Sequence, residues 1–256
     1  MQGFDRASVN RFVLSHECAS GGFSFSRTTP PTLEDTYYAL RIFQELGIGY
    51  KNKKTVRHVR ELCLMNESNM RNVYRLMYLL DRLSLYDLLD AWKEKLKTMS
   101  DKCSFFDCYY RLLSGEIVDE HVRARLNSVS GLRMAAYVPD VSRQAVFLKK
   151  TKVRFNEKKY AKWLREAQMP DGGYGFLKNS TSFMDTTYYA LKGLGILDTA
   201  PADLGACRRF VLICKTREGF GRQINSLPTL EATYHAVSCL NILEEMEKTS
   251  LVSAAT

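Results

Sequence analysis

Long apolar runs are missing from this sequence, and its first ten residues are polar. The chain therefore predicts no membrane span and no secretory signal, and we expect it in the cytoplasm. Seven cysteines, an odd number without a disulfide-like framework, fit a reducing compartment. With no linker or low-complexity segment, 256 residues at 45% apolar content predict one globular domain over residues 1–247 and a frayed tail over residues 248–256.

Nucleic-acid motifs are also missing, although the chain has a net charge of +9. Its basic residues gather in short runs at 51–54 and 149–154, without interleaved aromatic residues. We therefore expect no nucleic-acid partner and interpret most of these runs as solvated helix ends. A diphosphate or an acidic protein partner remains a possible ligand for the others.

What the chain does contain is a repeat in which a glycine loop precedes a helix rich in threonine and tyrosine. The loops read Gly-Gly-Phe-Ser-Phe, Gly-Gly-Tyr-Gly-Phe and Gly-Phe-Gly, and the helices contain Thr-Tyr-Tyr-Ala-Leu twice and Thr-Tyr-His-Ala-Val once. In each copy a loop glycine precedes the threonine by 14 positions, and equal spacing in three places indicates a repeat architecture. The pairs are Gly22 and Thr36, Gly173 and Thr187, and Gly219 and Thr233.

Each copy predicts a helical hairpin: an outer helix, the glycine turn, and then an inner helix that opens with a threonine or an acid. Two helices cannot bury their apolar faces alone, so the hairpins must stack. Thr36 and Thr187 are 151 residues apart, or four steps of about 38, a normal helical-hairpin period. We therefore predict six hairpins, twelve helices and no significant sheet. The inner helices should begin near Thr32, Asn69, Phe105, Pro139, Ser182 and Thr229.

The repeat resembles that of the protein prenyltransferase β-subunits and the terpenoid cyclases. The stretch Gln-Met-Pro-Asp-Gly-Gly-Tyr-Gly-Phe at 168–176 is especially similar, and the resemblance covers Val9–Ile48 and Trp163–Leu243. It implies an all-α fold, an α/α toroid with six inner helices around an aromatic-lined central cavity and six outer helices. It also implies an isoprenoid ligand in that cavity, and closure of the ring would bring the first and sixth hairpins together.

The zinc ligands of the transferases are missing. In that family an Asp-x-Cys pair and a His hold zinc at the starts of two late inner helices, and these positions are Thr186, Tyr188 and Ala232 here. His235 lies three positions further along, and residues 101–103 spell Asp-x-Cys outside the repeat register. We therefore expect no metal ligands, no zinc and no other cofactor, with Mg²⁺ only alongside a diphosphate.

The stretch from Thr32 to Thr36 resembles the Asp-x-Asp-Asp-Thr motif of protonating terpenoid cyclases, with Glu34 at the proton-donating position and Asp35 beside it. An ionised neighbour and burial can keep one carboxyl protonated, ready to attack an alkene. The acidic position recurs as Asp185 in another copy, which helix capping alone would also favour. Capping and catalysis both remain open for these acids.

Aromatic side chains follow the acids on the inner helices and occupy the glycine loops. Neighbouring helical residues differ by about 100°, so one tyrosine of each pair would face the cavity and the other would pack between helices. Such rings form either an ordinary core or a pocket that holds an isoprenoid or a carbocation. The candidate substrate-binding residues are Phe23, Phe25, Tyr37, Tyr174, Phe176, Tyr188, Tyr234 and His235, with Lys178 and Arg222 as cations for a diphosphate.

Two classes of function remain open. The first is an isoprenoid-handling enzyme, either a prenyltransferase-like protein without the usual zinc site or a small cyclase that uses Glu34 and Asp35. The second is a non-catalytic toroid scaffold that binds a protein partner through its basic rim. The filling of the centre separates them, because packed side chains would leave no room for an isoprenoid.

Overall fold

The computed structural model describes residues 5–26, 28–65, 67–98, 104–115 and 134–255. These residues form eleven helices and one small sheet, which confirms the all-α prediction. The twelfth predicted helix, which begins the hairpin at 119–150, lies outside the described residues. The chain divides into two compact units, an N-terminal unit, Arg6–Ile117, and a C-terminal unit, Val118–Thr256 together with Met1–Asp5.

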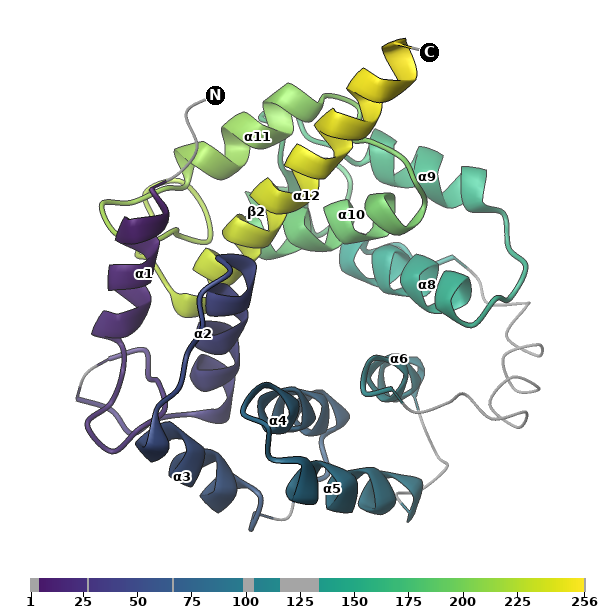
Figure 1. The fold of residues 1–256 in the computed structure, drawn as a ribbon. Coiled ribbons are helices and arrows are strands. Elements are labelled where there is room, and N and C mark those ends of the chain that lie inside the picture. Colours follow the sequence, from purple (N-terminus) through teal and green to yellow (C-terminus); the bar gives the residue numbers. More distant parts are fainter. Residues whose placement is uncertain (1–4, 27, 66, 99–103, 116–133, 256) are drawn as a thin grey trace. The chain divides into compact units, whose positions relative to one another are not determined.

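Helices of the N-terminal unit alternate between two layers, as stacked hairpins require. The outer helices α1, α3 and α5 lie on one side of the inner helices α2, α4 and α6 (Figure 1). Helix α4 packs against α2 and α6. The bounds are α1 Arg6–Ser15, α2 Leu33–Glu45, α3 Lys53–Leu62, α4 Met70–Arg82, α5 Tyr86–Thr98 and α6 Phe105–Leu113.

The C-terminal unit repeats this alternation. The inner helix α10 packs between α8 and α12, and the outer helices α9 and α11 cover them (Figure 1). A two-stranded antiparallel sheet, β1 with β2, closes the loop before α10. The bounds are α8 Val138–Lys150, α9 Glu157–Glu166, β1 Tyr174–Gly175, β2 Ser182–Phe183, α10 Met184–Ile196, α11 Leu204–Ile213 and α12 Leu230–Ala255.

Helix α12 continues to Ala255 and so includes most of residues 248–256, the stretch that the sequence predicts to be frayed. Even so, no helix in the described part of the chain is long and apolar enough to cross a membrane.

Side-chain caps begin four of the six inner helices, whereas α8 and α10 begin without one. The Thr32 hydroxyl accepts from the Asp35 N–H at 3.0 Å, and Ser104 forms a reciprocal capping box with Asp107. Pro139 stands in the first turn of α8, where its missing N–H leaves no helical bond unmade. All six inner helices begin within two residues of their predicted starts.

One buried hydrogen bond explains the 14-residue spacing of the repeat. The residue after the loop glycine is a fully buried aromatic, and its backbone N–H donates to the threonine hydroxyl of the inner helix. A buried N–H needs such a partner, so the loop cannot change length without losing it. The three bonds are Phe23 to Thr36, Tyr174 to Thr187 and Phe220 to Thr233, each 3.0 Å long.

The first glycine of each Gly-Gly pair docks on the start of the next outer helix. Gly21 and Gly172 have φ of +94° and +91°, a backbone conformation that glycine adopts without strain. A Cβ on Gly21 would lie 2.2 Å from the Lys54 carbonyl carbon, and one on Gly172 would lie 2.1 Å from the Ala206 oxygen. Only glycine therefore allows the loop to approach α3 or α11 this closely.

A polar side chain four residues before each of these glycines braces the same junction. Gln168 donates to the Asp203 carbonyl and accepts from the Asp203 N–H, both at 2.8 Å. At the other junction Glu17 accepts from the Asn52 amide at 2.5 Å and from the Tyr50 hydroxyl at 2.7 Å. Asp203 and Asn52 are the N-caps of α11 and α3, so each loop holds the cap of the following helix.

The Tyr174 hydroxyl is buried without a hydrogen-bond partner among the described residues. Phe23 and Phe220 occupy the equivalent position in the other copies, so the site accepts phenylalanine. We expect Tyr174→Phe to raise the free energy of unfolding by about 1 kcal/mol, because it removes an unsatisfied buried group. Urea denaturation would measure the change. In the control, Tyr160→Phe should lower stability by about 1 kcal/mol, since the Tyr160 hydroxyl bonds Gln144 at 3.3 Å. A loss of stability in Tyr174→Phe would contradict the prediction.

Candidate functional site

Aromatic and basic side chains recur at two fixed positions of the inner helices. We count from the residue directly before each inner helix. The fifth residue after it is tyrosine in five of the six inner helices and Ser142 in α8. The sixth is aromatic or basic in all six. The fifth-position tyrosines are Tyr37, Tyr74, Tyr109, Tyr188 and Tyr234. The sixth-position residues are Tyr38, Arg75, Tyr110, Arg143, Tyr189 and His235.

In the N-terminal unit these rings join three inner helices. Tyr37 of α2 contacts Tyr74 and Tyr78 of α4, with ring centroids 6.0 and 5.1 Å apart. Tyr74 in turn lies 5.9 Å from Tyr110 of α6. The predicted ligand-binding residue Tyr37 therefore belongs to a continuous tyrosine cluster.

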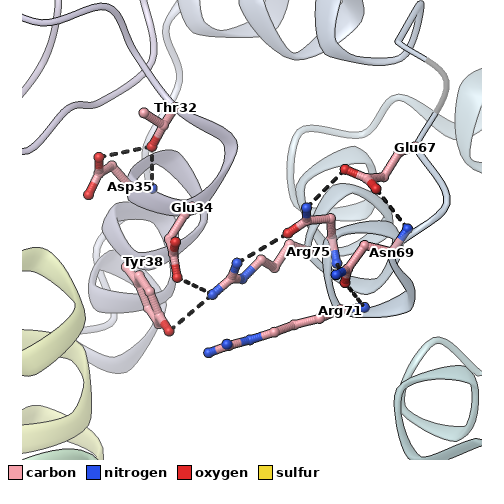
Figure 2. Close-up of polar contacts among 9 residues, drawn as sticks. Thr32, Glu34, Asp35, Tyr38, Glu67, Asn69, Arg71 and Arg75 are labelled. Atoms are coloured by element: carbon pink, nitrogen blue, oxygen red, sulfur yellow. Dashed lines mark hydrogen bonds and ion pairs between the residues drawn. The ribbon is translucent and has the colours of Figure 1, made fainter. Parts of the chain in front are cut away.

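A buried arginine, Arg75 of α4, reaches from this cluster to the candidate catalytic acid. Figure 2 shows Glu34 and Tyr38 of α2 pointing toward its guanidinium, which donates to a Glu34 carboxylate oxygen and, at 3.3 Å, to the Tyr38 hydroxyl. Arg75 is only 5% exposed, and its guanidinium carbon lies 5.5 Å from the centre of the Tyr38 ring. The arginine thus combines an ion pair with a cation–π contact.

A third hydrogen bond, to Asn72 of the same helix, holds Arg75 in this position. Asn72 accepts from Arg75 at 3.2 Å and donates its amide to Glu67 at 2.9 Å. Glu67 also accepts from the Asn69 N–H at 2.7 Å, so the chain of polar contacts ends at the cap of α4. Arg71 is one turn before Arg75, which places both arginines on the same face of the helix.

The two neighbouring acids of α2 have different partners. Asp35 accepts from the Phe25 N–H at 3.1 Å and from the Thr32 hydroxyl at 2.8 Å, so it supports the Thr32 cap and holds the loop backbone. Glu34 faces Arg75 instead. A guanidinium has donors only, so the Glu34 oxygen that meets it acts as an acceptor. The geometry gives Asp35 a structural role and places Glu34 beside a fixed positive charge.

The C-terminal unit contains a comparable cluster between α10 and α12. The hydroxyls of Tyr188 and Tyr234 are 2.8 Å apart, and the Tyr188 ring stacks on His235 with centroids 4.5 Å apart. The Lys192 ammonium lies 5.3 Å from the Tyr188 ring centre. Three of the predicted ligand-binding residues are therefore brought together, and all three are buried.

This unit also repeats the placement of arginine over tyrosine. Arg143 of α8 lies 4.3 Å above the ring of Tyr189 of α10 and pairs with Asp140 at 2.9 Å. Arg75 and Tyr38 are at the same helical positions in the N-terminal unit. Neither arginine was predicted from the sequence, although counting from the start of each inner helix aligns both with the tyrosines of the other copies.

The loop cations predicted to hold a diphosphate have acidic partners. Arg222 forms a two-pronged contact with Asp185, at 3.2 and 3.1 Å, and its guanidinium lies 4.3 Å from the Phe183 ring. Lys178 pairs with Glu166 at 3.1 Å, and this contact lowers the pKa of the Glu166 carboxyl. Asp185, a candidate catalytic acid, is thus held by Arg222.

Two aromatics follow the glycine pair in each of the first two loops, and they differ sharply in burial. Phe23 and Tyr174 are fully buried core residues, and Phe23 packs on Tyr50 with centroids 5.5 Å apart. Phe25 and Phe176 are 57% and 48% exposed. Only the second aromatic of each loop is therefore open to a ligand from solvent.

Metal ligands do not gather in the described part of the chain, where no three His, Cys, Asp or Glu side chains lie close enough to hold an ion. The Asp-x-Cys at residues 101–103 lies outside the described residues.

A family model for the prenyltransferase alpha-alpha toroid domain matches residues 1–103 and 61–255. The two matches overlap, as matches to an internally repeated family can, and together they span nearly the whole chain. No curated protein matches the sequence.

Proposed function

The chain belongs to the family of prenyltransferase alpha-alpha toroid domains, and from this we propose that it binds an isoprenoid, as a prenyl diphosphate, on the tyrosine-rich faces of its inner helices. A prenyl diphosphate has an apolar chain and an anionic end, so its site needs aromatic surface and positive charge together. The repeated placement of a cation over an aromatic ring supports this proposal, because it supplies both within one contact. Arginines lie over tyrosines on the inner helices, and the loop cations Arg222 and Lys178 lie 4.3 and 5.0 Å from the ring centres of Phe183 and Trp163. The bound prenyl group would then be transferred or cyclised.

Zinc has no place in this mechanism. The positions of the family's zinc ligands carry Thr186, Tyr188 and Ala232. The Thr186 hydroxyl donates to the Phe183 carbonyl at 2.9 Å, and the Tyr188 hydroxyl bonds that of Tyr234 at 2.8 Å. The alanine side chain has no ligand atom, and the other two side-chain oxygens are engaged in hydrogen bonds within the protein. Mg²⁺ would enter only with the diphosphate.

Binding of farnesyl and geranylgeranyl diphosphate, together with released diphosphate, tests the proposal directly. We propose that Lys178 and Arg222 hold the diphosphate, and we expect Lys178→Ala and Arg222→Ala each to weaken affinity about tenfold, the effect of losing one charge-assisted contact. Lys162→Ala is the matched control, because Lys162 also pairs with Glu166, at 3.8 Å, but is exposed on α9. Unchanged affinity in both test variants would exclude the loop cations. Failure to bind either ligand would overturn the proposed function and favour the protein-binding scaffold.

A second experiment tests the alternative that Glu34 is the proton-donating acid of a cyclase. Because Glu34 accepts from Arg75, we expect Glu34→Gln to lower stability by about 1 kcal/mol, a value limited by the half exposure of this carboxylate, and to leave ligand affinity and turnover unchanged. Gln keeps the shape and the acceptor but has no acidic proton. Chemical denaturation and product analysis would measure the two effects. Loss of turnover with unchanged stability would instead support the cyclase.

A further inference from the structure

The N-terminal unit has a groove between two of its outer helices, on elements that the proposed function does not use. Helices α3 and α5 both pack on α4 and leave between them a space of about 490 Å³. This volume is within the range of small-molecule sites, about 300–1,000 Å³. The groove is therefore large enough for a ligand of moderate size.

The floor of the groove is apolar. Trp92 of α5 is buried there, and Cys63 at the end of α3 lines the groove with it. Leu88, one turn before Trp92, and Ala91, directly before it, continue the apolar surface, and Leu64 at the edge is 86% exposed. An apolar ligand body would remove these side chains from water.

The rim of the groove is basic. Arg57, Arg60 and Lys95 line it against a single lining carboxylate, Glu61, a net charge of +2. The Lys95 ammonium lies 4.1 Å from the Trp92 ring centre, directly beside the apolar floor. The groove therefore joins an apolar surface to positive charge.

Existing ion pairs leave the two arginines available to an anion. Arg57 pairs with Glu61 at 3.0 Å and Arg60 with Asp87 at 3.7 Å, and all four side chains are largely exposed. Exposed pairs of this kind contribute only about 0–1 kcal/mol, so an incoming anion can replace the carboxylates.

We propose that this groove binds a small amphiphilic anion, a carboxylate with an aliphatic chain. The chain lies on Trp92 and Leu88, and the headgroup meets Arg60 and Lys95 at the rim. This site is independent of the tyrosine faces of the inner helices.

Trp92 makes the site measurable, because the chain has only one other tryptophan, Trp163. In a Trp163→Phe background, titration with decanoate below its micelle concentration should give a saturable change in Trp92 fluorescence. Lys95→Met should weaken this binding about tenfold, and Ala91→Leu, which fills the groove without changing charge, should weaken it as strongly. Lys93→Met is the matched control, because Lys93 is on the same helix but outside the groove, paired with Asp90 at 2.8 Å.

Three results would overturn the proposal. Absence of a saturable change would show that the groove binds no such ligand. Equal binding of decyltrimethylammonium would show that the positive charge of the groove does not select for anions. A fluorescence change that follows protein concentration and dimerisation would assign the groove to a second copy of the chain. Farnesyl diphosphate affinity, measured in the same groove variants, should stay unchanged, so failure here is distinguishable from failure of the isoprenoid proposal.

Discussion

Gly172→Ala is expected to lower the free energy of unfolding by about 2–5 kcal/mol, through the sum of backbone strain and overpacking. Gly172 has φ of +91°, which an L-residue adopts only at a cost. Its new Cβ would also lie 2.1 Å from the backbone oxygen of Ala206, and backbone cannot rotate aside as a side chain can. Relief of that clash requires α11 to move away from the loop. Urea or guanidinium denaturation, followed by circular dichroism, would give the loss.

Gly47→Ala separates the two contributions. Gly47 also has a positive φ, +69°, but a Cβ there would meet no described atom within 4 Å. Only the conformational cost remains, about 1–2 kcal/mol. If both variants lose the same stability, the close approach of Gly172 to α11 contributes nothing and the prediction is wrong.

Thr187→Val should lower the free energy of unfolding by about 2–3 kcal/mol, because it leaves buried polar groups unsatisfied. The Thr187 hydroxyl accepts from the Tyr174 N–H at 3.0 Å and donates to the Phe183 carbonyl at 2.8 Å. Valine keeps the shape of threonine but can do neither. The stability of the variant would be measured by denaturant unfolding at constant pH.

Thr187→Ser is the control for that change, since it keeps the hydroxyl and removes one methyl group, which costs about 1 kcal/mol. A valine variant as stable as the serine variant would show that the hydroxyl does not hold the loop.

The fold could be predicted from the sequence because a few local contacts depend on fixed distances along the chain. The 14-residue spacing of Gly173 and Thr187 is fixed by one hydrogen bond, from the Tyr174 N–H to the Thr187 hydroxyl. The same spacing and the same bond recur in all three copies, which is why the repeat is visible in the sequence. Caps such as Thr32 and Ser104 also stand directly before their helices. Both signals are local, so they survive without knowledge of tertiary contacts.

The candidate site was predicted less well because its contacts join distant residues. Arg75 meets Glu34, 41 residues away, and lies in a hairpin that has no glycine pair to mark it. The ion pair of Arg222 with Asp185 spans 37 residues. Phe23 and Phe25 are two residues apart in one loop, and both were predicted to bind a ligand although Phe23 is fully buried.

The junctions between hairpins have a consequence for how such a chain can evolve by duplication. Gln168 holds the backbone of Asp203, whereas Glu17 holds the amide of Asn52. A rearranged gene that placed a Glu17-type loop before an Asp203-type cap would bring two carboxylates together and would remove the donor for the Asp203 carbonyl. Copied hairpins are therefore not interchangeable. Each loop is matched to the helix that follows it, so the contacts at the junctions restrict the order in which the hairpins can follow one another.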